Sequence, residues 1–168
     1  GHKRVWFIDF SHTGNGLSPG HVAELQAQGY PVDALRGHTL RDFGRLEADV
    51  KFLLTRLCSD EDLRLATAFE RALLSQSPDL AGLPEVPPFP AAEADERFQK
   101  AWRVVREIRC HAARYLAWQE DTRAYWWSLL HATLPIVYYH PAQFAGAECE
   151  RQQKRYALLA AGMLCARL

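Results

Sequence analysis

Apolar residues recur at steps of three and four along most of the chain, the spacing that places them on one face of an α-helix. One stripe follows Thr39, a second follows Ser59 and three successive carboxylates, and a third begins after Ala91. Their members are Leu40, Phe43, Leu46, Val50, Leu53, Leu54 and Leu57, then Leu63, Leu65, Ala66, Phe69, Ala72 and Leu73, then Phe98, Trp102, Val105, Ile108, Ala112, Tyr115 and Leu116. Further helices are predicted over residues 124–130 and 148–167. The pattern therefore predicts a mostly helical protein.

Two short segments depart from the helical spacing. Val5–Phe10 and Leu134–Tyr139 are dense in β-branched and aromatic residues, a composition typical of half-buried strands. If the two segments pair, they form a small β element with helices packed over it. We therefore expect a mostly α fold, a single helical domain with a two-stranded β element at about residues 5–10 and 134–139.

One segment cannot be a continuous helix. Residues 77–90 contain five prolines, and each interior proline removes a backbone hydrogen bond and clashes with the preceding turn. We expect a surface connection that joins two helical lobes, residues 18–76 and 91–168, with a polyproline docking segment as the alternative. A chain of 168 residues fits a single domain over 1–168, since domains commonly hold roughly 100–150 residues.

The stretch Arg4–Gly20 contains a compact group of candidate binding residues. Its predicted strand leads into a glycine-bearing loop with Ser11, Thr13 and Asn15, and a serine followed by a proline then favours a helix start. Glycines let backbone amides approach a ligand, and a helix N-terminus attracts anions. The loop matches neither the P-loop nor the dinucleotide-binding spacing, so a nucleotide is not indicated and any cofactor is unknown. A polar turn that caps the helix is the alternative.

Asp9, His12 and His140 are the candidate catalytic residues. Asp9 interrupts an apolar segment, where a buried carboxylate is costly unless an arginine such as Arg109 or Arg114, a metal or a substrate faces it. His12 follows the first predicted strand and His140 the second, so parallel pairing would bring both imidazoles near Asp9 as acid and base. This constellation predicts a small hydrolase or transferase. Hydrogen-bonded surface histidines are the alternative.

Aromatic residues are concentrated in the last third of the chain. Tryptophan and tyrosine favour positions with one apolar and one wet side, including ligand pockets and protein interfaces. Adjacent Trp126 and Trp127 cannot share one helix face, so at least one should reach a boundary. With Tyr139, they favour a soluble binding or interaction module that contacts a partner protein or a small ligand, and this is the function we expect first.

Charge and residue spacing give no strong signal for several other classes of partner, with a local basic face as the alternative. Lys and Arg number 20, as do Asp and Glu, so the chain lacks the net positive field typical of nucleic-acid binding. No apolar run approaches the roughly 18 residues that a membrane span needs. Glu107 and His111 are one helical turn apart, but a carboxylate-bridged metal centre would need Glu-x-x-His, which the chain lacks. We therefore expect no metal. The oligomeric state is not indicated.

The four cysteines are Cys58, Cys110, Cys149 and Cys165. No C-x-x-C pair occurs among them, and most lie in apolar helical contexts, where free cysteine behaves as a small hydrophobe. We therefore expect reduced, structural cysteines. The first residues also lack the long apolar run of a signal peptide, so a cytoplasmic location is expected.

Overall fold

The computed structural model describes residues 23–24, 27–29, 39–75, 79–88, 95–116, 122–144 and 146–168. Five long helices dominate this part of the chain: α3 (Thr39–Asp49), α4 (Asp60–Ser75), α6 (Glu96–Leu116), α7 (Arg123–Thr133) and α8 (Glu150–Arg167). The shorter pieces are a π-helical turn, η2 (Val50–Leu54), and the 3₁₀ turns η3 (Leu80–Gly82), η4 (Leu134–Tyr138), η5 (Pro141–Gln143) and η6 (Ala147–Cys149). The predicted mostly helical fold is confirmed.

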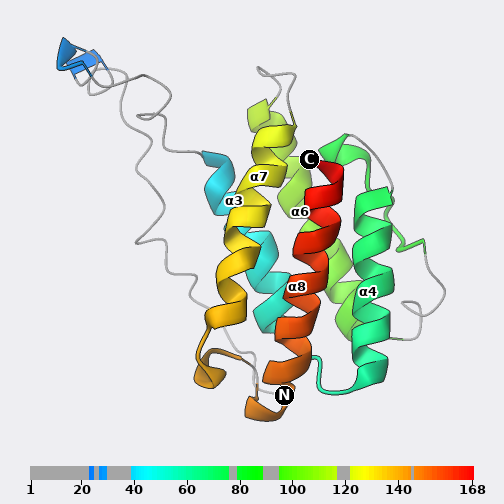
Figure 1. Ribbon diagram of the computed structural model, residues 1–168. Coiled ribbons are helices and arrows are strands. Elements are labelled where there is room, and N and C mark those ends of the chain that lie inside the picture. Colours follow the sequence, from blue (N-terminus) through cyan, green and yellow to red (C-terminus); the bar gives the residue numbers. More distant parts are fainter. Residues whose placement is uncertain are drawn as a thin grey trace, which may run out of the picture.

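The helices form a bundle around one hydrophobic core. In Figure 1, α8 runs between α7 and α4, and it packs against both. Helix α3 lies along α7 and also contacts α6. Helices from both sides of the proline-rich connection contribute to this core, because Phe52 and Phe69 are buried in the same cluster as Trp102 and Tyr156.

The start of α4 follows the capping signal in its sequence. The Asp62 backbone N–H donates to Ser59 Oγ at 3.0 Å, and the Asp62 carboxylate accepts from the Ser59 backbone N–H at 2.9 Å. This reciprocal arrangement is a capping box, with Asp62 at the position more often held by glutamate. It satisfies amide groups that the first turn of a helix leaves without intrahelical partners.

The strand predicted over Leu134–Tyr139 is wrong. Leu134–Tyr138 is the 3₁₀ turn η4 and continues directly from α7. Pro135 lies in the first turn of η4 and cannot donate the backbone hydrogen bond that would continue α7. Ile136 is fully buried, and η4 packs on α8, so tertiary packing overrides the strand propensity. No strand occurs among the residues that the structure describes; Val5–Phe10 lies outside them.

Part of the proline-rich connection is docked on α6. Leu80 and Leu83 are buried, and the Trp102 indole N–H donates to the Pro84 carbonyl at 2.8 Å. Arg106 Nε donates to the Leu83 carbonyl at 3.3 Å. The segment therefore covers part of the core instead of crossing open solvent.

Candidate functional site

Side chains that carry charge are buried at the centre of the bundle. The Glu47 carboxylate on α3 accepts hydrogen bonds from Arg109 Nε and Nη2 on α6 at 2.8 and 2.7 Å, and from the Tyr125 hydroxyl on α7 at 2.5 Å. Arg109 Nη1 donates to the Leu73 carbonyl at 2.8 Å, which satisfies an acceptor in the last turn of α4. One arginine therefore connects three helices.

A second ion pair adjoins the first. Lys51 Nζ in η2 lies 2.7 Å from Glu70 Oε1 on α4 and 3.5 Å from Glu47 Oε1. The Tyr156 hydroxyl on α8 donates to Glu70 Oε2 at 2.8 Å. The π-helical turn that carries Lys51 is closed by a hydrogen bond from the Thr55 N–H to the Val50 carbonyl. Two carboxylates and two cations thus form a neutral buried set, the central ionic network.

The protonation states of this network follow from its contacts. Burial alone raises the pKa of Glu47, but the charges of Arg109 and Lys51 and the hydrogen bonds from Arg109 and Tyr125 outweigh it and hold the pKa at about 2. Burial and the nearby carboxylates raise the pKa of Tyr125 and Tyr156 well above the usual range. Both hydroxyls therefore stay protonated as donors. The enclosed network thereby joins α3, α4, α6, α7 and α8.

The sequence contains an indication of this network: charged residues occupy positions on the apolar faces of two predicted helices. Glu47 lies on the stripe between Phe43 and Val50, and Lys51 follows it one turn later. Glu70 likewise lies beside Phe69 on the apolar face of α4. Charged residues at core positions of an amphipathic helix indicate buried pairing, although their partners on other helices cannot be read from one sequence.

The exposed aromatic side chains lie along α7 and η4. Trp127 is 51% exposed, Leu134 46% and Tyr138 89%, and His131 between them is also exposed. Trp127, His131 and Leu134 follow one another at steps of four and three residues, so they share a side of the helix. We call Trp127, His131, Leu134 and Tyr138 the α7–η4 face.

Trp126 lies about 100° around α7 from Trp127 and is 3% exposed. Two guanidinium groups lie against its ring, with Arg109 Cζ 4.9 Å and Arg167 Cζ 4.3 Å from the ring centroid. The Tyr125 ring meets it edge-on at 5.4 Å. The expectation that one of the adjacent tryptophans reaches the surface is confirmed, and the exposed one is Trp127.

The other predicted site residues are only partly described. Tyr139 is half-buried and its ring faces Arg45 Cζ at 5.6 Å. His140 is exposed and caps η5, because its Nδ1 accepts from the Ala142 N–H at 3.3 Å. The remaining candidates lie outside the described residues: Asp9, Ser11, His12, Thr13 and Asn15. Arg109, considered as a partner for Asp9, is bonded to Glu47. The hydrolase or transferase hypothesis stays a prediction.

An apolar groove lies between α3 and α6. It has a volume of about 310 Å³ and is lined by Phe43, Leu46, Val104 and Ile108, with Arg103, Glu107 and His111 also contributing. Ligand sites typically combine an apolar lining with a few convergent polar groups, whereas the accessible surface of this groove is almost wholly apolar. Glu107 Oε1 is paired with Arg106 Nη1 at 2.9 Å. The groove therefore offers little to orient a small polar ligand.

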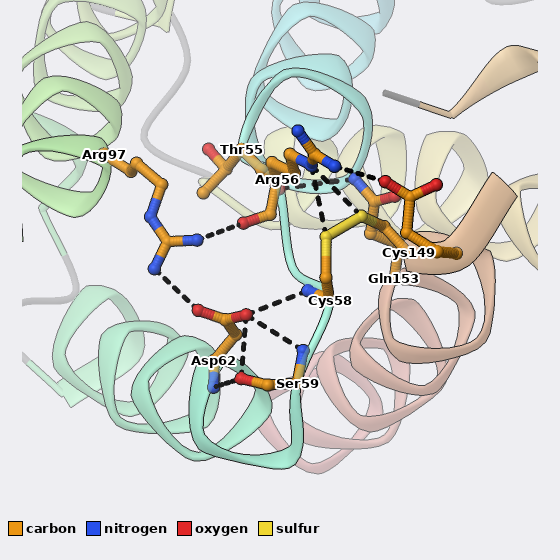
Figure 2. The surroundings of a disulfide bond; sticks show 9 residues. Thr55, Arg56, Cys58, Ser59, Asp62, Arg97, Cys149 and Gln153 are labelled. Carbon is orange, nitrogen blue, oxygen red and sulfur yellow. Dashed lines mark hydrogen bonds and ion pairs between the residues drawn. A yellow bond between two sulfur atoms is a disulfide. The ribbon is translucent and has the colours of Figure 1, made fainter. Parts of the chain in front are cut away.

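The expectation that all four cysteines are reduced is wrong. Cys58 and Cys149 form a disulfide across 91 residues of sequence, and Cys110 and Cys165 are free. The disulfide joins the connection before α4 to the turn before α8 (Figure 2). Packing of α4 against α8 brings the two cysteines together, and a separation of this length gives no signal in the sequence.

Comparison with protein-family models, with curated proteins and with solved structures finds no match for this chain. No helix in the part of the chain that the structure describes is long and apolar enough to cross a membrane.

Proposed function

We propose that this protein is a binding module whose α7–η4 face contacts a partner protein. The observation that carries the proposal is the exposure of Trp127 and Tyr138 on one continuous helical segment. Tryptophan and tyrosine are the residue types most enriched among the dominant contacts of protein interfaces. The face lies on the outside of a helix, whereas small ligands are held in concave sites, so the proposal specifies a protein.

The rigid setting of the face supports the same proposal. Trp126 packs against Arg109 and Arg167, and Gly44 of α3 approaches the α7 backbone closely at Ser128 and Leu129. The backbone that carries Trp127 is therefore fixed before a partner binds. Ordering an interface on binding costs free energy, and a preorganised face avoids part of that cost.

The absence of negative charge on the α7–η4 face indicates the chemistry of the partner. The described segment 122–144 contains no Asp or Glu, although the whole chain contains 20. The α7–η4 face, Trp127, His131, Leu134 and Tyr138, therefore carries no carboxylate that would repel an acidic partner. A partner surface with apolar side chains flanked by carboxylates fits this face and meets no like charge on it. The partner we propose is an acidic amphipathic helix.

The proposal can be tested with two helical peptides that share one apolar face and differ only in flanking Glu or Lys residues. Isothermal titration calorimetry should show saturable binding of the acidic peptide, weakened about tenfold by Trp127→Ser or by Tyr138→Ser. Leu158→Ser is the matched control, because Leu158 is a 61% exposed apolar residue on α8. Absence of saturable binding, preference for the basic peptide, or equal weakening by Leu158→Ser would each contradict the proposal.

The cytoplasmic location expected from the sequence stays a prediction. Stable disulfides are rare in cytosolic proteins, so the Cys58–Cys149 bond counts against it. Trapping free thiols with an alkylating agent in intact cells, before lysis, shows whether this pair is oxidised where the protein resides.

A further inference from the structure

The Cys58–Cys149 disulfide has one accessible and one enclosed sulfur. Cys58 is partly exposed in the connection that precedes α4, whereas Cys149 at the end of η6 is fully buried. An attacking group that comes from solvent therefore meets Cys58 before it can meet Cys149. Thiol–disulfide exchange depends on which sulfur is attacked and on how well the other sulfur leaves.

A single guanidinium group lies against both sulfurs. Arg56 Nε donates to Cys58 Sγ at 3.2 Å and to Cys149 Sγ at 3.3 Å, and Figure 2 shows the side chain extending over the disulfide. The Arg56 side chain is 54% exposed, so the disulfide lies near solvent. A cation beside a sulfur favours its thiolate form.

The backbone of Arg56 is fixed independently of the disulfide. Arg97 Nη1 on α6 donates to the Arg56 carbonyl at 2.7 Å, and Arg97 Nη2 lies 2.6 Å from Asp62 Oδ1. On the other side, Gln153 Nε2 on α8 donates to the carbonyl of the preceding residue, Thr55, at 3.3 Å. These contacts hold the backbone of residues 55–56 beside the disulfide from two other helices (Figure 2).

We propose that this disulfide is a modification site at which a low-molecular-weight thiol forms a mixed disulfide with Cys58. The sulfur of the incoming thiolate forms a bond to Cys58 Sγ, the bond between Cys58 Sγ and Cys149 Sγ breaks, and Cys149 leaves as a thiolate beside Arg56. A second thiolate of the same class then attacks the mixed disulfide. It releases the Cys58 thiolate and yields the disulfide of the small thiol, so two electrons pass to the protein.

Two carboxylates lie near the sulfurs and act differently. Asp62 is neutralised by Arg97 and accepts the Cys58 backbone N–H at 2.9 Å. Glu148 pairs with Arg56 Nη2, and its carboxylate lies within 4.8 Å of both sulfurs. The Glu148 charge therefore opposes formation of the Cys149 thiolate, and its removal should make exchange faster.

Incubation of the folded protein with glutathione, followed by peptide mapping in a mass spectrometer, tests the proposal. The adduct should appear on Cys58 and not on Cys149. Arg56→Gln should slow its formation about tenfold, and Glu148→Gln should accelerate it about threefold. Arg64→Gln is the matched control because Arg64 is an exposed arginine paired only to Glu61 among the described contacts; its rate should equal that of the wild type.

The same assay in low concentrations of urea separates local exchange from exchange through global unfolding. A rate that stays nearly constant below the unfolding transition supports attack on the native disulfide. A rate that rises in proportion to the unfolded fraction, an adduct that starts on Cys149, or an Arg56→Gln rate equal to wild type would each overturn the proposal.

Discussion

The Arg109 guanidinium holds the Glu47 carboxylate through two hydrogen bonds, of 2.8 and 2.7 Å, in a setting where Arg109 is 2% exposed and Glu47 is fully buried. A two-point contact between planar groups fixes orientation as well as distance. The contact sets α3 against α6, and the third Arg109 bond, to the Leu73 carbonyl, adds the end of α4.

The first prediction concerns this pair. Arg109→Met should destabilise the protein by about 3–5 kcal/mol, because it leaves a buried carboxylate without its main counter-charge. The double variant Glu47→Leu/Arg109→Met should lose less than the single variant, because no uncompensated charge remains. Urea unfolding of the wild type, Glu47→Leu, Arg109→Met and the double variant gives the coupling energy. If the double variant is less stable than Arg109→Met, the pair is not the source of the loss.

Stability should also depend on pH through Glu47. Its pKa is about 2 in the folded protein against 4.5 for an ordinary glutamate, so the folded state holds the carboxylate ionised. The resulting stabilisation, of order 3 kcal/mol, is complete above about pH 4.5 and is lost as the pH falls toward 2. Urea unfolding measured between pH 7 and pH 2 should therefore show a steeper loss in wild type than in Glu47→Gln. Parallel curves for the two proteins would contradict the assignment.

Because α3 and α7 approach closely at Gly44, any side chain larger than that of glycine should lower the stability of the protein. A Cβ atom at this position would lie 2.8 Å from backbone atoms of Ser128 and Leu129, which cannot move without shifting α7. Gly44→Ala should lower stability by about 1–3 kcal/mol. Gly162→Ala on α8 is the matched control, since its added Cβ would meet nothing within 4 Å and helix propensity favours alanine by about 1 kcal/mol. Thermal unfolding of both variants compares them, and equal shifts would refute the packing argument.

Adjacent Trp126 and Trp127 should respond in opposite ways to substitution. Trp126→Ala removes a buried ring that packs against two arginines and should cost about 3–5 kcal/mol. Trp127→Ser removes an exposed side chain and should change the free energy of unfolding by less than about 0.5 kcal/mol. Chemical denaturation of the two variants distinguishes these outcomes. A large loss for Trp127→Ser would mean that this side chain has a structural role.

The helices could be predicted from the sequence because the residues that determine them are close to one another in the chain. The apolar stripe after Thr39 and the cap at Ser59 both lie within a few residues of the structure they determine. The predicted strand at 134–139 failed because Ile136 is packed on α8, a contact that propensity does not contain. The Cys58–Cys149 bond and the Glu47–Arg109 pair escaped prediction for the same reason, since each joins residues that only the bundle brings together.

Part of the candidate site could likewise be predicted from the sequence, and part depends on contacts between helices. The concentration of aromatics in the last third was visible in the sequence, and the need for one of two adjacent tryptophans to face outward follows from helix geometry. Which one is exposed depends on Arg109 and Arg167 packing against Trp126, and these arginines come from other helices.

The central claim, that the α7–η4 face binds an acidic amphipathic helix, is tested most directly by mapping NMR chemical-shift changes during titration with the Glu-flanked peptide. The proposed function predicts that the largest changes fall on residues 123–140, with Trp127 and the Tyr138 amide prominent among them. Changes centred instead on the groove lined by Phe43, Leu46 and Ile108, or on Leu158 and Leu159 of α8, would contradict it.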